Sequence, residues 1–522
     1  MKAPIWAALA LCIALAGCTP MAPSPSDTPT PTDPPATSGP PAPQPPPPLP
    51  DPAPPVPIQD AARFSGVAML SAGSNCTGTL IDTGVPSGPA YVLTNGHCVG
   101  DVGRSAHTTT IEHEWFGAAE FLRVEDNLDN TLKVDVVQIA YSTMRHTDTA
   151  IIRLAVSLGY LQELGIQPIR ITGAEPAEGS AVTNIGAPTQ DLHPDDWMLR
   201  RSECTLGSQH TLIEFLWLWQ KVWSNDCAGI IQGSSGSPLL TLNDNGSPSE
   251  IVAMINTTTG GSRVSDGGAC SLNRPCEVGP NGPTMVENTS YAQSVAGIGG
   301  CFTAEGNFAL GQSCPLPMSS VWAETGSGGS FRGGDLPDAN GRTPAVGLVG
   351  RTPSTVRTAL VPLGDGTACL MPETYASAAV IDIPQAGYEW EQLADPLQVD
   401  LPEVEGHYTL CAVAGDDYDG AASVLFEVDR TPPVFPATAE IEDIGGGSVV
   451  VRPHLNPPEL STFRFTWGDP KTVDCEDTSN FQNFMIVPLT LTTENLPASY
   501  CLYGLDHAGN TTPVNRIEIE RR

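Results

Sequence analysis

The chain has 522 residues, and its 24 basic and 58 acidic side chains give a formal charge of −34 at pH 7. Only 16% of the residues are charged and 40% are hydrophobic, a composition that predicts folded domains and excludes a charge-rich disordered chain. At roughly 150 residues per domain, the length corresponds to about three domains. A strongly acidic chain gains no affinity from phosphate backbones, so we do not expect nucleic acid as a partner.

Residues 1–18 have the pattern of an export signal. Lys2 precedes an apolar run from residue 5 to residue 15, which is too short to span a bilayer. The LAGC sequence at residues 15–18 resembles a bacterial lipobox. That resemblance implies cleavage before Cys18, lipidation of Cys18, and an exported lipoprotein anchored at the outer membrane or cell surface.

Residues 19–57 contain 19 prolines in 39 residues and few apolar side chains. Such a segment favours extended polyproline II, with about 3.1 Å per residue. We therefore predict a linker that holds the next domain away from the membrane.

Export also bears on the cysteines. Removing Cys12 with the signal and Cys18 for the lipid leaves twelve, an even number, which in an oxidising compartment predicts six disulfides. The chain has no CxxC pair and no HExxH motif, so we expect neither a metal nor an organic cofactor.

Short apolar stretches separated by Gly, Pro and Ser follow residue 63, and their spacing predicts an all-β core. Three local patterns lie within it in a fixed order. They are CTGTLID with YVLTNGHC (residues 76–82 and 91–98), DTAIIRL (148–154) and GSSGSPLL (233–240).

Together these patterns resemble the trypsin-like or chymotrypsin-like serine endopeptidases over roughly residues 60–315, in the chain order His, Asp, Ser. The resemblance implies a two-barrel β fold and acyl transfer on a protein or peptide substrate. It makes His97 the general base and Asp148 the residue that fixes the histidine tautomer. It makes Ser235 the nucleophile, with the N–H groups of Gly233 and Ser235 as the oxyanion hole.

Other residues compete for two of these roles. His107, His113 and His146 lie nearby in sequence, but a strand and a small-residue turn precede only His97. Asp135, in VDVVQIAY, is the alternative aspartate.

The chain departs from the animal digestive enzymes at two positions. Ser234 stands where those enzymes have the aspartate that pairs with a newly cut N-terminus, so we expect no dependence on an activating cleavage. The GxSGSP pattern resembles that of bacterial glutamyl endopeptidases. Gly229 stands six residues before Ser235, where trypsin has an aspartate, so cleavage after Lys or Arg is unsupported.

The substrate pocket is expected along IVAMIN (251–256) and just after it. We expect Gly229, Asn256, Thr257 and Thr258 to contact substrate. The aromatic segment TLIEFLWLWQKVW (211–223) predicts a buried strand or helix, and the alternative is a wall of the substrate cleft.

After residue 314 a Gly-rich segment predicts a linker, and a weak internal repeat follows. PLGDGTAC (362–369) recurs as TWGDPKTVDC (466–475), and residues 407–420 recur as 499–510. These units predict two β-sandwiches and resemble bacterial immunoglobulin-like and fibronectin type III-like modules. The predicted divisions are a signal (1–18), a linker (19–57), a protease domain (58–316), a second linker (317–334) and two sandwich modules (335–432 and 433–522).

The pairing of the twelve cysteines follows partly from the resemblance. It implies a disulfide beside the histidine, Cys76–Cys98. Spacing favours one disulfide within each module, Cys369–Cys411 and Cys475–Cys501. Cys204–Cys227, Cys270–Cys276 and Cys301–Cys314 complete the set, and the last four cysteines can exchange partners.

The sequence thus predicts a monomeric, lipid-anchored, extracytoplasmic serine endopeptidase whose C-terminal modules can bind a surface ligand. The alternative is an adhesion or scaffold protein with a catalytically silent protease-like domain.

Overall fold

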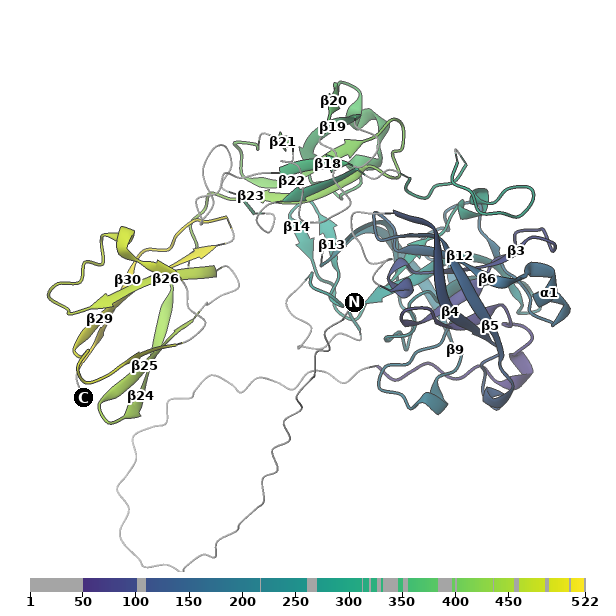
Figure 1. The fold of residues 1–522 in the computed structure, drawn as a ribbon, viewed down its shortest axis with the longest axis horizontal. Helices are drawn as coiled ribbons and strands as arrows, with labels where there is room; N and C mark the ends of the chain where they lie inside the picture. Colours follow the sequence, from purple (N-terminus) through teal and green to yellow (C-terminus); the bar gives the residue numbers. More distant parts are fainter. Residues whose placement is uncertain are drawn as a thin grey trace, which may run out of the picture. The chain divides into compact units, whose positions relative to one another are not determined.

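The computed structural model describes residues 50–100, 109–215, 217–260, 270–311, 313–318, 321–325, 330–331, 346–350, 355–383, 397–399, 401–434, 436–454, 460–483, 488–506 and 508–520. The predicted export signal, Cys18 and most of the proline-rich linker lie outside these residues. Strands dominate the fold (Figure 1), as the all-β prediction requires. Within the described ranges, no helix has the length and apolar character needed to cross a membrane.

Six strands form a closed first barrel in the order β1-β2-β3-β6-β5-β4. Closure leaves no unpaired edge. Its interior holds large apolar side chains such as Leu70, Leu80 and Phe121, each fully buried. The strands are β1 (Val67–Ser71), β2 (Asn75–Leu80), β3 (Pro89–Thr94), β4 (Thr109–Phe121), β5 (Leu132–Thr143) and β6 (Thr149–Ser157).

A second sheet has the order β10-β15-β12-β11-β8-β9-β13-β14, with β7 paired to β12. Because β10 also pairs with β9, the strands from β10 to β9 close into a second barrel. This arrangement confirms the two-barrel prediction. The strands are β7 (Arg170–Ile171), β8 (Ala181–Gly186), β9 (Arg200–Glu214), β10 (Trp217–Asn225), β11 (Pro238–Leu242), β12 (Pro248–Thr258), β13 (Cys276–Gly279), β14 (Gly282–Thr284) and β15 (Ser290–Ser294).

Helical structure is sparse. The α-helix α1 (Leu158–Glu163) follows β6 and begins at Ser157, whose hydroxyl accepts a hydrogen bond from the Tyr160 amide. Such a bond satisfies one of the unpaired N–H groups of the first turn. The 3-10 helices are η1 (Ile58–Asp60), η2 (Gly96–Val99), η3 (Leu128–Asn130), η4 (Pro194–Asp196), η6 (Ile298–Cys301), η7 (Ala368–Leu370), η8 (Pro372–Tyr375) and η9 (Thr478–Asn480).

The predicted boundary between the first linker and the protease domain is too late. Val56 is fully buried in the core, and its backbone bonds to Leu199 and Glu125. Ala53 is also buried. The proline-rich composition hid this packing, because proline carbonyls still accept hydrogen bonds and the Pro54 carbonyl accepts one from the Arg201 amide.

Two β domains follow the barrels. The first has a three-stranded sheet, β16-β18-β21, and a five-stranded sheet, β17-β23-β22-β19-β20. The second has a three-stranded sheet, β24-β25-β28, and a four-stranded sheet, β27-β26-β29-β30. Two sheets in each domain are consistent with the predicted sandwiches.

The second predicted linker is also misplaced. Residues 317–334 were expected to be a spacer, but β16 (Val321–Thr325) pairs with β18 (Val346–Gly350), and β17 (Ser330–Phe331) pairs with β23. Both belong to the sheets of the first module. The remaining strands of that module are β19 (Thr355–Pro362), β20 (Val380–Asp382), β21 (Leu397–Val399), β22 (Gly406–Val413) and β23 (Ala422–Val428).

The two modules share one strand order, which explains the weak sequence repeat. The order β20-β19-β22-β23 in the first matches β27-β26-β29-β30 in the second, and β16-β18-β21 matches β24-β25-β28. The strands of the second module are β24 (Thr438–Gly445), β25 (Ser448–His454), β26 (Leu460–Gly468), β27 (Gln482–Asn483), β28 (Leu489–Leu491), β29 (Ala498–Asp506) and β30 (Asn515–Ile519).

All twelve cysteines expected in disulfides are paired in the structure. The pairs are Cys76–Cys98, Cys204–Cys227, Cys270–Cys276, Cys301–Cys314, Cys369–Cys411 and Cys475–Cys501. This is the pairing that the sequence favoured, and the four cysteines with open partners adopt the local pairs. Six disulfides indicate an extracytoplasmic protein.

The packing of residues 50–57 gives a first prediction. Deleting the chain through Pro57 removes the buried Val56 side chain, which contributes about 2 kcal/mol. It also removes the bonds that Ala53, Pro54 and Val56 make to the barrels. We expect the thermal midpoint of the two-barrel domain to fall by at least roughly 4–8 °C in calorimetry. A deletion that stops before Pro50 is the matched control and should leave the midpoint unchanged. Equal midpoints for the two deletions would contradict the packing.

Candidate active site

His97 lies on η2, directly after β3, and the loop that carries it is fixed on both sides. On one side, the side-chain amide of Asn95 donates a 2.8 Å hydrogen bond to the backbone carbonyl of Asp148. On the other, the Cys76–Cys98 disulfide ties η2 to β2. The imidazole position is therefore set by the first barrel.

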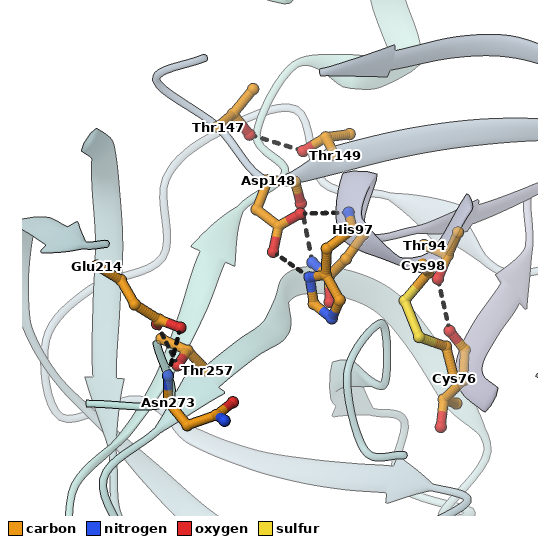
Figure 2. A network of polar contacts seen from close by, with 12 residues as sticks. Cys76, Thr94, His97, Cys98, Thr147, Asp148, Thr149, Glu214, Thr257 and Asn273 are labelled. Carbon is orange, nitrogen blue, oxygen red and sulfur yellow. Dashed lines mark hydrogen bonds and ion pairs between the residues drawn. A yellow bond between two sulfur atoms is a disulfide. The ribbon is translucent and has the colours of Figure 1, made fainter. Parts of the chain in front are cut away.

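Asp148 is fully buried immediately before β6, and it holds His97 through two hydrogen bonds (Figure 2). Its Oδ1 accepts the His97 amide at 3.1 Å, and its Oδ2 lies 2.8 Å from His97 Nδ1. A carboxylate only accepts, so Nδ1 carries the proton and Nε2 is left as the proton acceptor. This is the arrangement of a histidine prepared to act as a base.

The loop that contains Ser235 is held between the two barrels. From β2, the Thr77 amide donates to the Ser235 carbonyl at 2.8 Å, and the Thr77 hydroxyl donates to the Gly233 carbonyl at 3.0 Å. From the other side, the Gly236 amide donates to the Ile255 carbonyl of β12. A side chain at Gly236 would place Cβ 2.0 Å from the Thr77 carbonyl oxygen, and its φ of +83° also requires glycine.

Several amides of this loop are satisfied internally, and two are not. Those of Ser234 and Ser237 donate to the Ile231 and Ser234 carbonyls. Within the described part of the chain, the amides of Gly233 and Ser235 donate to no protein acceptor. They are the two N–H groups that the sequence assigned to an oxyanion hole.

His97 and Ser235 line one cleft of about 810 Å³, to which both barrels contribute. Of the predicted pocket residues, Asn256, Thr257 and Thr258 also line it. Other parts of its wall are the stretch 230–233 and the tryptophans Trp217 and Trp219.

The expectation for Gly229 is not met, because it lies outside the residues that line this cleft. Its φ is +73°, and an added Cβ would lie 2.2 Å from the Ala53 nitrogen. Gly229 therefore serves the close approach of the segment at residues 52–53, which the sequence had placed in a linker.

The aromatic segment 211–223 forms the end of β9 and most of β10. Both of its predicted roles apply. Trp219 is only 1% exposed, as a buried strand requires, yet it and Trp217 line the cleft.

The competing residues lie elsewhere. His113 and Asp135 are exposed on β4 and β5. His146 is buried, and burial together with the nearby Arg145 charge lowers its pKa to about 3, so it stays neutral. His107 lies outside the described residues.

Glu214 lines the same cleft and escaped the sequence analysis. It is the last residue of β9, and its side chain is buried. Figure 2 shows its carboxyl group bonded to Thr257 and Asn273 in the same view as His97 and Asp148. Its one visible signal was a lone acid within an aromatic stretch.

Burial raises the pKa of Glu214 to about 7. The hydrogen bonds from Thr257 and Asn273 and the nearby His97 lower it, and Asp148 raises it, but desolvation is the largest cause. The carboxyl group therefore changes charge near neutral pH.

One cluster of potential metal ligands occurs among the described residues, formed by Cys76, His97 and Cys98. Both thiols are consumed by the Cys76–Cys98 disulfide. The chemistry of this donor set therefore does not fit a metal ion.

The raised pKa of Glu214 gives a stability prediction. The native state binds this proton more tightly than the unfolded chain does. The contribution of Glu214 to the free energy of unfolding therefore falls as pH rises from 4.5 to 7. The shift corresponds to about 3 kcal/mol. Chemical unfolding of the protease domain at pH 5 and pH 8 should show this loss in the wild type and not in Glu214→Gln. The matched control is Glu287→Gln, an exposed residue outside the cleft lining, which should keep the wild-type pH dependence. The same pH dependence in Glu214→Gln and the wild type would contradict the assignment.

One protein family and several solved structures resemble part of the chain. Residues 57–277 match the family model described as Trypsin. No curated protein matches the chain. A thermostable serine protease, AL20, from an extremophilic microorganism aligns with a TM-score of 0.30 and 13% identity over 45% of this chain and 93% of its own. A Glu endopeptidase in complex with MPD aligns with a TM-score of 0.30 and 17% identity over 47% of this chain and 92% of its own. Residues 57–277 of the chain are thus similar in sequence to the Trypsin family.

Proposed function

We propose that the protein is an endopeptidase in which Ser235, His97 and Asp148 form the catalytic triad. The observation that carries the proposal is the pair of hydrogen bonds from His97 to the buried Asp148, on the wall of a cleft that also contains Ser235. A serine hydroxyl is a poor nucleophile until a neutral imidazole accepts its proton. The His97 tautomer supports that role.

In the proposed reaction, Ser235 Oγ attacks the peptide carbonyl carbon while His97 Nε2 takes the hydroxyl proton. The tetrahedral oxyanion accepts hydrogen bonds from the Gly233 and Ser235 amides. His97 then gives the proton to the leaving amine, and an acyl-enzyme remains. Water attacks this ester with His97 again as base, which releases the carboxylate and restores Ser235.

No activating cleavage is expected in this proposal. The residue before the nucleophile is Ser234, which is buried and has its hydroxyl within 3.4 Å of the Ile231 amide. It offers no carboxylate for a new α-amino group to pair with. The GxSGSP pattern supports a place near the bacterial glutamyl endopeptidases.

The domain is proposed to act outside the cytoplasm. A lipid attached to Cys18 and the proline-rich linker are proposed to tether it to the membrane. The disulfides support an oxidising compartment. The two C-terminal modules are proposed to be immunoglobulin-like and to bind a surface ligand. The alternative of a silent adhesion protein has no observation in its favour.

Covalent labelling tests the nucleophile. A fluorophosphonate probe should label the purified wild-type protein with no added activating protease, and Ser235→Ala should abolish labelling. The matched control is Ser234→Ala, which changes the adjacent hydroxyl and should keep labelling. Absence of labelling in folded, disulfide-bonded wild-type protein would overturn the proposal and favour the silent adhesion protein.

Two aspartate variants test the base. Asp148→Asn should lower kcat by about 10⁴-fold, because an amide at this position favours the wrong histidine tautomer. Asp135→Asn removes the exposed alternative on β5 and should leave kcat within about twofold of wild type, since surface changes away from a site have small effects. Peptide hydrolysis at pH 8 measures both. The reverse ranking of the variants would place the aspartate at residue 135.

A further inference from the structure

Glu214 and the two tryptophans of β10 form a composite wall of the active-site cleft. All three residues line the cleft that contains His97 and Ser235. The proposed mechanism uses none of them. Their chemistry is a carboxyl group beside aromatic rings, which is unlike the aliphatic and hydroxyl groups of Ile230, Ile231 and Thr258 elsewhere in the lining.

The Glu214 side chain keeps capacity for a ligand. Its residue is only 3% exposed. Oε2 accepts the Thr257 hydroxyl at 2.6 Å, and Oε1 accepts the Asn273 amide at 2.9 Å. A carboxylate has about four acceptor positions, so each oxygen has room for another donor.

The carboxyl group of Glu214 forms no ion pair with a Lys or Arg of the described ranges. The groups that face it are Trp217 from β10, Thr257 from β12 and Asn273 from the segment before β13. The charged groups that act on it are His97 and Asp148. A buried carboxylate without a cation is costly, and a bound cation removes that cost.

The tryptophans lie beside this carboxyl group. Trp217 is the direct cross-strand partner of Glu214, so the two side chains project from the same face of the β9–β10 pair. Trp219 lies on that face too, because side chains two residues apart on a strand share a face. The indole rings are stacked, with centroids 5.8 Å apart and an angle of 11° between the planes. Aromatic faces attract Lys and Arg side chains.

We propose that Glu214, Trp217 and Trp219 form a specificity subsite that binds a positively charged side chain of the peptide substrate. The inference rests on the proposed endopeptidase activity and names a substrate class for the same cleft. The charged side chain is Lys or Arg, since these combine a cation with a stem that packs on indole rings. The substrate side chain bound by this subsite differs from one that would contact Gly229, because Gly229 lies outside the cleft lining.

The net charge of the chain favours such substrates as well. A formal charge of −34 raises the local concentration of basic peptides through long-range attraction. That attraction is not specific to one subsite, and the experiment must separate the two effects.

Paired peptide substrates provide the test. A quenched fluorescent peptide series carries Lys at one position at a time on either side of the scissile bond, and each peptide has a twin with neutral norleucine there. We expect one position at which kcat/KM favours Lys by about tenfold or more at pH 8. Glu214→Gln should reduce this ratio to near one, while Glu287→Gln, which removes an exposed charge outside the cleft, should keep it.

The pH dependence of the Lys to norleucine ratio gives a readout that needs no variant. Glu214 is mostly protonated below pH 7, so the preference should be weaker at pH 6 than at pH 8. A structural role for Glu214 would not make the ratio depend on pH.

Two failures can be told apart. If Ser235 is labelled and peptides are cleaved, but no position prefers Lys over norleucine, the subsite proposal is overturned and the endopeptidase proposal stands. A Lys preference that survives Glu214→Gln and is lost at high salt reflects the net charge and also overturns the subsite. If the wild type is neither labelled nor active, the underlying function fails.

Discussion

The candidate site depends on one buried threonine that joins the two barrels. Thr77 belongs to β2 of the first barrel, yet its amide and hydroxyl bond to the Ser235 and Gly233 carbonyls. The same hydroxyl accepts the Ala187 amide at 2.8 Å, just beyond β8 of the second barrel. These two bonds use the only proton of the hydroxyl and one of its two lone pairs. Because β2 also carries Cys76, the disulfide partner of Cys98, this strand positions both the histidine loop and the serine loop.

Local sequence patterns led to the candidate residues of this part of the molecule. His97, Asp148 and Ser235 were each found from a few neighbouring residues, since a strand end, a turn and a glycine-rich loop leave short-range traces in sequence. Glu214 left almost none. It reaches the cleft only because β9 and β10 pair as a hairpin and β10 closes the second barrel. Such long-range placement cannot be seen in a window of ten residues.

The two boundary errors have a related cause. Composition assigned residues 51–57 and 317–334 to linkers because they are rich in proline or glycine. Both stretches nevertheless join folded domains through backbone hydrogen bonds, as Val56 and β16 do. Backbone pairing depends little on side-chain identity, so composition misses it. The repeat between the modules was detected because side chains, rather than backbone bonds, carry it. Cys411 and Cys501 occupy β22 and β29, which hold equivalent places in the two sheets, and buried cysteines restrict their surroundings strongly.

The two buried carboxyl groups of Asp148 and Glu214 differ in what surrounds them, and this difference separates their proposed roles. Asp148 has a partner that can become a cation, and its two bonds to His97 fix the ring before any substrate arrives. Glu214 has only neutral donors, so desolvation dominates its environment. Similar groups take different roles when their environments differ. The first carboxyl group is thereby suited to orient a base. The second is complete only when the substrate supplies the missing charge, and a cleft built in this way couples recognition of a basic side chain to the ionisation of its own wall.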